Sequence, residues 1–190
     1  MAPVTDKVQE SNKCWRFTLT VERMLSALEM LDREDLLPEV KTREAARLLV
    51  RGRVDEKDAA KALKIAFELI QKDESKHPSS GPQVISFTQD WGYIKAAFLQ
   101  AYGIDLTKEA RRMHWCNFID LLRAVPDSTR LAKIMEIRAI PLPKPTKYNA
   151  EERARLSKLK AQYAIKSTKS DVVDGLKGLF GALAAQAKGR

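Results

Sequence analysis

The residues best suited to nucleophilic chemistry are two cysteines and two histidines, Cys14, Cys116, His77 and His114. A catalytic cysteine needs a base within hydrogen-bond reach and a third group that orients the base. His114 is two positions from Cys116, which places their side chains on different sides of one predicted helix. The thiols lack the spacing of a zinc site, and two lone thiols are more often reduced than joined in a disulfide. We therefore predict no catalytic or metal-binding role for these residues.

Acidic pairs are the second possible source of chemistry, because two carboxylates can act as general acid and base. Asp32, Glu34 and Asp35 more often begin a turn or lie on a solvated face than form such a pair. Glu151 and Glu152 are adjacent, so in a helix they point to different sides. The chain also lacks the short motifs that bind phosphate, calcium or catalytic zinc, and the nucleophile motif of hydrolases. We predict a binding protein with no cofactor rather than an enzyme.

The elements that position the remaining side chains are predicted to be helices. In the block from Phe87 to Arg138, large apolar residues recur at helical spacing, which places each set on one helix face. The two clearest sets are Trp91, Ile94, Phe98 and Ala101, then Trp115, Phe118, Ile119 and Leu122.

Capping residues predict where these helices begin and end. Thr88 or Asp90 is the expected start of the first helix, and Gly103 its expected end. The third helix of the block is expected to begin after a proline, with Asp127 or Ser128 accepting hydrogen bonds from its first backbone N–H groups.

The predicted fold class is all-α, an irregular multi-helix bundle with an N-terminal helical lobe, Trp-centred middle helices and a basic C-terminal helical extension. Residues 15–31 form either a strand-like lead into a helix or one continuous helix. At 190 residues and 44% hydrophobic, the chain can bury one sizeable core or two small ones. The expected segments are a flexible arm at 1–13, the N-terminal lobe at 14–72, a linker or loop at 73–84, the middle block at 85–139, a Pro-rich spacer at 140–149 and basic C-terminal helices at 150–190.

Four stretches of the chain occur in an order that carries a family resemblance: QDxxYIKAAFLQAYGIDL, a Trp-centred HWxxFxxLL, PDSTRLAKIxxIR and EERARLSKLKAQYA. This order resembles a family of siphophage proteins encoded between the major tail protein and the tape-measure protein. The resemblance covers residues 16–165 and is strongest from Phe87 onward. It implies an all-helical tail-assembly chaperone, a non-virion protein that keeps the long, aggregation-prone tape-measure protein soluble while the tail tube polymerises.

The implied partner is the tape-measure protein, with a second tail-assembly chaperone or self-association as further possibilities. Within the middle block we predict Trp115, Phe118 and Leu122 as partner-binding residues. On spacing alone, Trp115 and Phe118 are core residues more often than an exposed site. A minor structural tail protein is an alternative function from the same context.

The C-terminal segment carries an apolar stripe of its own. Residues 170–186 place Val173, Leu176, Phe180 and Leu183 at helical spacing, with Leu179 beside them. Three glycines interrupt this stripe, and each costs ~1 kcal/mol relative to alanine in a helix interior. We predict Leu176, Leu179, Phe180 and Leu183 as partner-binding residues, and we give equal weight to a weakly docked C-terminal helix.

Positive charge gathers toward the C-terminus. The net charge is +9, and residues 138–190 hold 12 basic and 4 acidic residues. Such a stretch can bind nucleic acid, lie on an anionic membrane, or steer an acidic protein partner. The nucleic-acid alternative would use Arg153, Arg155, Lys158 and Lys160, but no recognition motif accompanies them. We expect no specific nucleic acid as partner.

A membrane partner is not expected either. No segment approaches the ~18 consecutive apolar residues of a transmembrane helix, and the first residues lack the apolar core of a signal peptide. The expected location is the host cytoplasm, and the expected state is absence from the mature virion.

Overall fold

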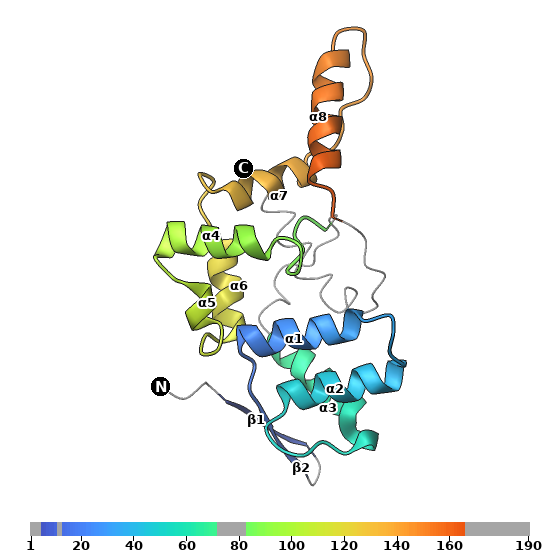
Figure 1. Cartoon of the computed structure of the whole chain (residues 1–190), viewed down its shortest axis with the longest axis vertical. Coiled ribbons are helices and arrows are strands. Elements are labelled where there is room, and N and C mark those ends of the chain that lie inside the picture. Colours follow the sequence, from blue (N-terminus) through green and yellow to red (C-terminus); the bar gives the residue numbers. More distant parts are fainter. Residues whose placement is uncertain (1–4, 11–12, 72–82, 166–190) are drawn as a thin grey trace.

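The computed structural model describes residues 5–10, 13–71 and 83–165, and within these ranges the chain forms eight helices and one two-stranded sheet. The bounds are β1 Asp6–Glu10, β2 Lys13–Phe17, α1 Val21–Asp32, α2 Pro38–Leu49, α3 Glu56–Gln71, α4 Trp91–Tyr102, α5 Leu106–Glu109, α6 Trp115–Arg123, α7 Arg130–Ala139 and α8 Ala150–Gln162. Figure 1 shows the hairpin at one end of the molecule and α8 projecting at the opposite end. The predicted all-α multi-helix fold is confirmed, with the small sheet as an addition.

The sheet is an antiparallel hairpin in which Asp6 lies opposite Phe17 and Val8 lies opposite Trp15. Trp15 and Phe17 are buried while Arg16 between them is exposed, which is the alternation of a strand with one face on a core. The prediction of a flexible arm is therefore wrong for residues 6–10, because their backbone groups pair with β2. The open question about residues 15–31 is also answered, since β2 leads into α1 as a separate element.

A fully buried stretch, Phe17–Val21, connects the hairpin to α1. Buried backbone N–H and C=O groups must find partners, and this stretch finds them on two sides. On one side the Thr18 N–H donates to the Leu49 carbonyl at 2.8 Å, at the end of α2. On the other, the Trp115 N–H donates to the Leu19 carbonyl at 2.8 Å, at the start of α6. The stretch thus joins the N-terminal helices to the middle block.

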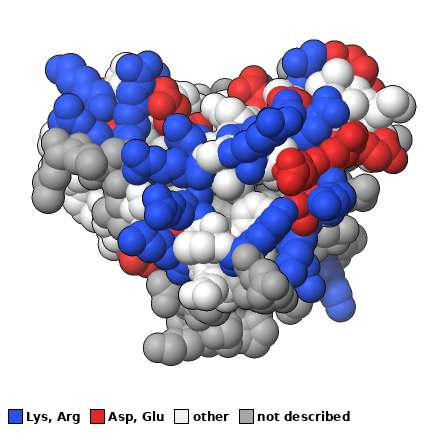
Figure 2. All heavy atoms as spheres, turned by 90° about the horizontal axis from the view of Figure 1, so that it is seen from below, with Lys and Arg blue, Asp and Glu red and all other residues white. Residues whose placement is uncertain are grey.

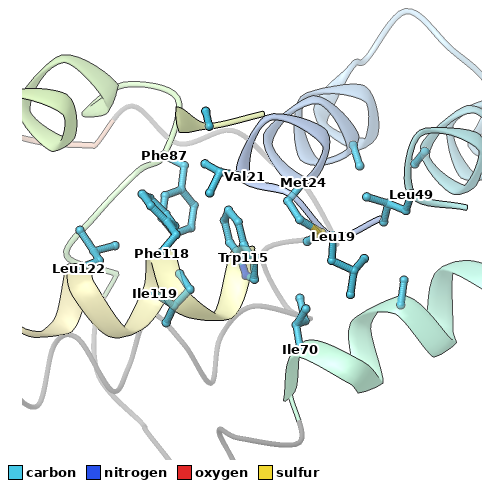
Figure 3. Close-up of a cluster of buried hydrophobic side chains, with 14 of the residues drawn as sticks. Leu19, Val21, Met24, Leu49, Ile70, Phe87, Trp115, Phe118, Ile119 and Leu122 are labelled. Carbon is cyan, nitrogen blue, oxygen red and sulfur yellow. The ribbon is translucent and has the colours of Figure 1, made fainter. Parts of the chain in front are cut away.

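The hydrophobic core is one cluster that includes residues from both of those parts. Figure 3 shows side chains of α1, α2, α3 and α6 turned toward a common interior. At its centre the Phe118 ring lies 5.2 Å from Phe98 and 5.3 Å from Trp115, measured between ring centroids. Val84 is fully buried as well, so the predicted linker is wrong at its C-terminal end, while residues 73–82 lie outside the described residues.

The helix ends follow local rules in some places and tertiary contacts in others. α4 ends at Gly103 as predicted, in the left-handed conformation (φ 65°), which glycine adopts without strain. α7 is capped by Thr129, whose hydroxyl accepts from the Ala132 N–H at 3.2 Å; Asp127 and Ser128 were the predicted caps. Asp90 occupies the N-cap position of α4, but its carboxylate makes no cap hydrogen bond to that helix.

None of the helices in the described part of the chain combines the length and apolar character that crossing a membrane requires. The histidines, cysteines and acidic residues in this part form no group of three or more that could hold a metal ion. Cys14 is exposed and Cys116 is half-buried, and they form no disulfide with each other.

Leu19→Ala tests whether the core behaves as one unit. Leu19 is fully buried, so the substitution should lower the free energy of unfolding by about 2–5 kcal/mol. Urea unfolding followed by tryptophan fluorescence and by far-UV circular dichroism should give coincident transitions in wild type and variant. Leu37→Ala is the matched control, because Leu37 is 69% exposed and should change stability by less than about 0.5 kcal/mol. Two separate transitions in the wild type would contradict a single core.

Candidate protein-docking arm

The C-terminal part of the described chain leaves the body of the protein as an arm, defined here as residues 140–165. Its first part is the Pro-rich stretch, in which residues 141–146 belong to neither helix nor strand. Proline removes a backbone donor and fixes φ, so alternating prolines favour extended backbone. α8 then runs back toward the body, and Figure 1 shows it standing clear of the other helices beyond α7.

A turn built by Asn149 reverses the chain at the tip of the arm. The Asn149 side chain accepts from the Thr146 N–H at 2.8 Å and donates to the Lys144 carbonyl at 2.9 Å. Asn149 does occupy the N-cap position of α8, but its side chain makes no cap hydrogen bond to the helix. Tyr148, next to this turn, is 92% exposed.

α8 is a helix without a buried side chain. Leu156, Leu159 and Tyr163, which helical spacing places on one narrow stripe, are only half-buried. A helix of this length is marginal in water on its own and normally depends on packing of an apolar face. Leu142 on the extended part is also exposed, at 41%. The arm therefore offers apolar side chains that its own fold does not bury.

The arm is fastened at its base by Arg138, near the end of α7. The guanidinium forms a bidentate ion pair with the Asp90 carboxylate, at 2.5 Å from Nη1 to Oδ2 and 2.9 Å from Nη2 to Oδ1. The same group donates from Nη1 to the Val84 carbonyl at 2.9 Å and from Nε to the Tyr163 carbonyl at 2.6 Å. Both charged side chains are buried, with 9% of Arg138 and 3% of Asp90 exposed. One side chain thus holds the start of α4 and the end of α8 together.

Two further contacts support this base. The Lys160 ammonium donates to the Arg138 carbonyl at 2.8 Å, and burial lowers the pKa of Lys160 because it disfavours the charged form. The Arg130 guanidinium lies over the Tyr163 ring at 5.4 Å and contacts its hydroxyl. The C-terminal end of α8 is therefore fixed to the body, while its N-terminal end lies at the turn that Asn149 builds.

The comparisons with known proteins place this architecture in a family. The family model described as "Bacteriophage Gp15 protein" matches residues 4–165, which include the hairpin, the core and the whole arm. The chain belongs to the Bacteriophage Gp15 protein family. A comparison with curated proteins and another with solved structures gave no match. The Gp15-family match ends at the last residue of the arm, so residues 166–190 lie beyond it.

The structure corrects the placement of the predicted partner-binding residues of the Gp15-family protein. Trp115, Phe118 and Leu122 are buried, with at most 2% exposed, because their helix face packs into the core. In this conformation they offer no surface to a partner and serve as core residues instead. The other predicted residues, Leu176, Leu179, Phe180 and Leu183, lie outside the described residues.

The residues of the nucleic-acid alternative divide into two kinds. Arg155 and Lys158 are exposed, whereas Arg153 and Lys160 are half-buried. Lys160 donates a hydrogen bond to the Arg138 carbonyl, so it stabilises the base of the arm. The four basic residues therefore do not form one exposed row for phosphates.

Lysine and arginine also cover much of the face that points away from α8, which Figure 2 shows from below. The basic residues of the N-terminal part include several with acidic partners. Arg43 Nε and Arg47 Nη1 lie 3.0 and 2.9 Å from Glu44 Oε1, and Lys13 contacts Asp58. Ion pairs at the protein surface contribute little to stability. The acidic partners nevertheless neutralise part of the positive charge through which this face could bind a nucleic-acid backbone.

The Arg138–Asp90 pair is open to a mutational test. Arg138→Met leaves the Asp90 carboxylate buried without its counter-charge, which should lower the free energy of unfolding by about 3–5 kcal/mol. Asp90→Asn combined with Arg138→Met should cost clearly less than Arg138→Met alone, since no charge is then left buried. Arg33→Met is the control, because the Arg33–Asp35 pair is exposed and its loss should hardly matter. Urea titrations of the four proteins give the comparison, and equal losses for the single and double variants would contradict it.

Proposed function

We propose that the protein is a non-enzymatic tail-assembly chaperone that binds the tape-measure protein and keeps it soluble while the tail tube is built. Its family is a bacteriophage family, and the resemblance given by the residue order from Phe87 onward implies this role. The observation that carries the proposal is the arm. α8 projects from the body, buries no side chain of its own, and leaves Tyr148 and Leu142 exposed beside it.

The chemistry of the arm fits an extended or helical protein partner with apolar and acidic residues. Large exposed apolar side chains on a soluble protein favour contact with another apolar surface. Residues 140–165 carry six basic residues and two acidic ones, which speeds encounter with a negatively charged segment. A helix that needs packing for its stability gains it when such a segment lies along it.

A non-catalytic role agrees with how His114 is used. Its Nδ1 accepts from the Cys116 N–H at 3.3 Å and so caps α6, and its Nε2 lies 2.9 Å from the Asp6 carboxylate. A ring nitrogen that accepts is unprotonated, so the pattern assigns the hydrogen to Nε2, which donates to Asp6. Both nitrogens are occupied in fastening β1 to the start of α6. The imidazole is therefore engaged in structure rather than poised as a base.

We propose further that the protein works in the host cytoplasm, where the tail is assembled, and leaves before the virion is complete. A chaperone of this kind needs an accessible surface that the tape-measure protein releases later, which suits contacts gathered on one projecting element.

Co-expression with the tape-measure protein tests the proposal. The wild-type protein should raise the soluble yield of the tape-measure chain and copurify with it. Leu142→Asp combined with Tyr148→Asp should weaken capture at least about tenfold, because losing one buried side chain costs about 1.5–3 kcal/mol. Leu37→Asp, another exposed apolar residue far from the arm in sequence, should behave as the wild type. If yield and copurification do not depend on the wild-type protein, the chaperone proposal fails.

Nucleic-acid binding is expected to be weak and independent of sequence. The arm has positive charge without a base-reading element, so phosphate contacts alone remain. Titration with duplex DNA and with RNA at ~0.15 M salt should give dissociation constants of only ~10⁻⁴ to 10⁻⁶ M. Tight binding that distinguishes sequences would favour the nucleic-acid alternative instead.

A further inference from the structure

The outward side of α4 is an exposed helix face without charge. We call Gly92, Tyr93, Ala96, Leu99 and Gln100 the α4 outer face; all five are exposed and fall within one arc of the helix. Leu99 is 58% exposed and Tyr93 39%. The only charged residue of α4, Lys95, is half-buried and lies outside this arc. A solvent-facing helix side normally carries charged residues, so this face has the composition of a contact surface.

The shape of this face suits a second helix. A Cβ atom placed on Gly92 would meet no atom within 4 Å beyond its chain neighbours and the backbone of its own helix, so the surface there is open. Ala96 follows one turn later, and Leu99 projects one turn after that. Two small residues beside a projecting leucine let another helix approach with its own apolar side chains around that leucine.

The described chain ends near the N-terminal end of α4. Arg138 binds the Tyr163 carbonyl and the Asp90 carboxylate with one guanidinium, and Asp90 directly precedes α4. Figure 1 shows the end of the arm beside the segment that leads into α4. Residue 165, the last one described, follows Tyr163 by two positions and therefore lies near the N-terminal end of α4, from which 25 further residues continue.

The length of those residues matches the distance to be covered. Leu99 lies nine residues beyond Asp90, about 14 Å along the helix axis. Residues 166–172 span up to about 23 Å when extended, which reaches that position. Val173–Leu183, which lies outside the described residues, carries the apolar stripe of the sequence. As a helix it would be about 16 Å long, close to the length of α4 of about 18 Å.

We infer that Val173–Leu183 of the same chain docks on the α4 outer face. The stripe of Val173, Leu176, Phe180 and Leu183 packs around Leu99, and apolar burial offsets the cost of the glycines in that segment. Docking within one chain is favoured over a second molecule because the short connection gives a high effective concentration. The α4 outer face is thus covered by the protein's own C-terminal segment.

Limited trypsin digestion of the full chain tests this inference. Lys177 lies within the docking segment, so docking should protect it, while Lys166 and Lys169 precede that segment. Leu99→Asp should speed cleavage at Lys177 about tenfold or more, because one buried leucine is lost to a charge. Leu37→Asp is the matched control, an exposed leucine on the loop before α2. Equal cleavage rates at Lys177 in wild type and Leu99→Asp would overturn the inference.

Disulfide trapping separates docking within a chain from docking between chains. In a background with Cys14→Ser and Cys116→Ala, the pair Leu99→Cys and Phe180→Cys should form an intrachain bond under mild oxidation. The control pair, Leu37→Cys and Phe180→Cys, should react at least about tenfold more slowly, since proximity sets the rate. Predominant interchain bonds would mean that a second copy covers α4, and no excess over the control would mean that the segment does not dock there. Either result would overturn the inference.

Discussion

The fold depends on the pairing of one short buried stretch, Phe17–Val21, with two parts of the chain that lie far apart in sequence. Its backbone groups are out of reach of water, so each hydrogen bond that α2 and the start of α6 provide replaces one that water would make in the unfolded chain. Removing either partner would leave buried polar groups unsatisfied. This requirement, together with the apolar contacts of the shared core, fixes how the N-terminal helices are oriented on the middle block.

Local patterns predicted the elements better than their arrangement. The helical spacing around Trp115 and Phe118 identified α6, and Gly103 marked the end of α4, because both signals act over a few residues. β2 also left a signal, since Trp15, Phe17, Leu19 and Val21 alternate with polar residues over several positions. The strand opposite it carries no comparable alternation, and its fastening through Asp6 and His114 joins residues 108 positions apart. No local rule reports such a pair.

The candidate site was only partly visible in the sequence for a similar reason. The prolines indicated where the chain leaves the body, and the sparse apolar stripe of α8 indicated a helix with little to bury. The sequence carries no signal for the role of Arg138. Its side chain binds the backbone carbonyls of Val84 and Tyr163 and the carboxylate of Asp90, all of them distant in sequence. Carbonyls are present at every position, so sequence cannot tell which of them an arginine will bind.

The arm is fastened at one end only of α8, by Arg138 and the neighbouring contacts of Lys160 and Arg130, and this makes it a lever. Any pull applied near Tyr148 acts at the far end of α8 and reaches the body through the contacts of Arg138 and through residues 140–147, which join the tip to α7. Because the same guanidinium forms an ion pair with Asp90, part of that load passes into the start of α4. Mechanical force on the tip and the position of α4 are therefore coupled through one ion pair, at the place where the arm meets the body.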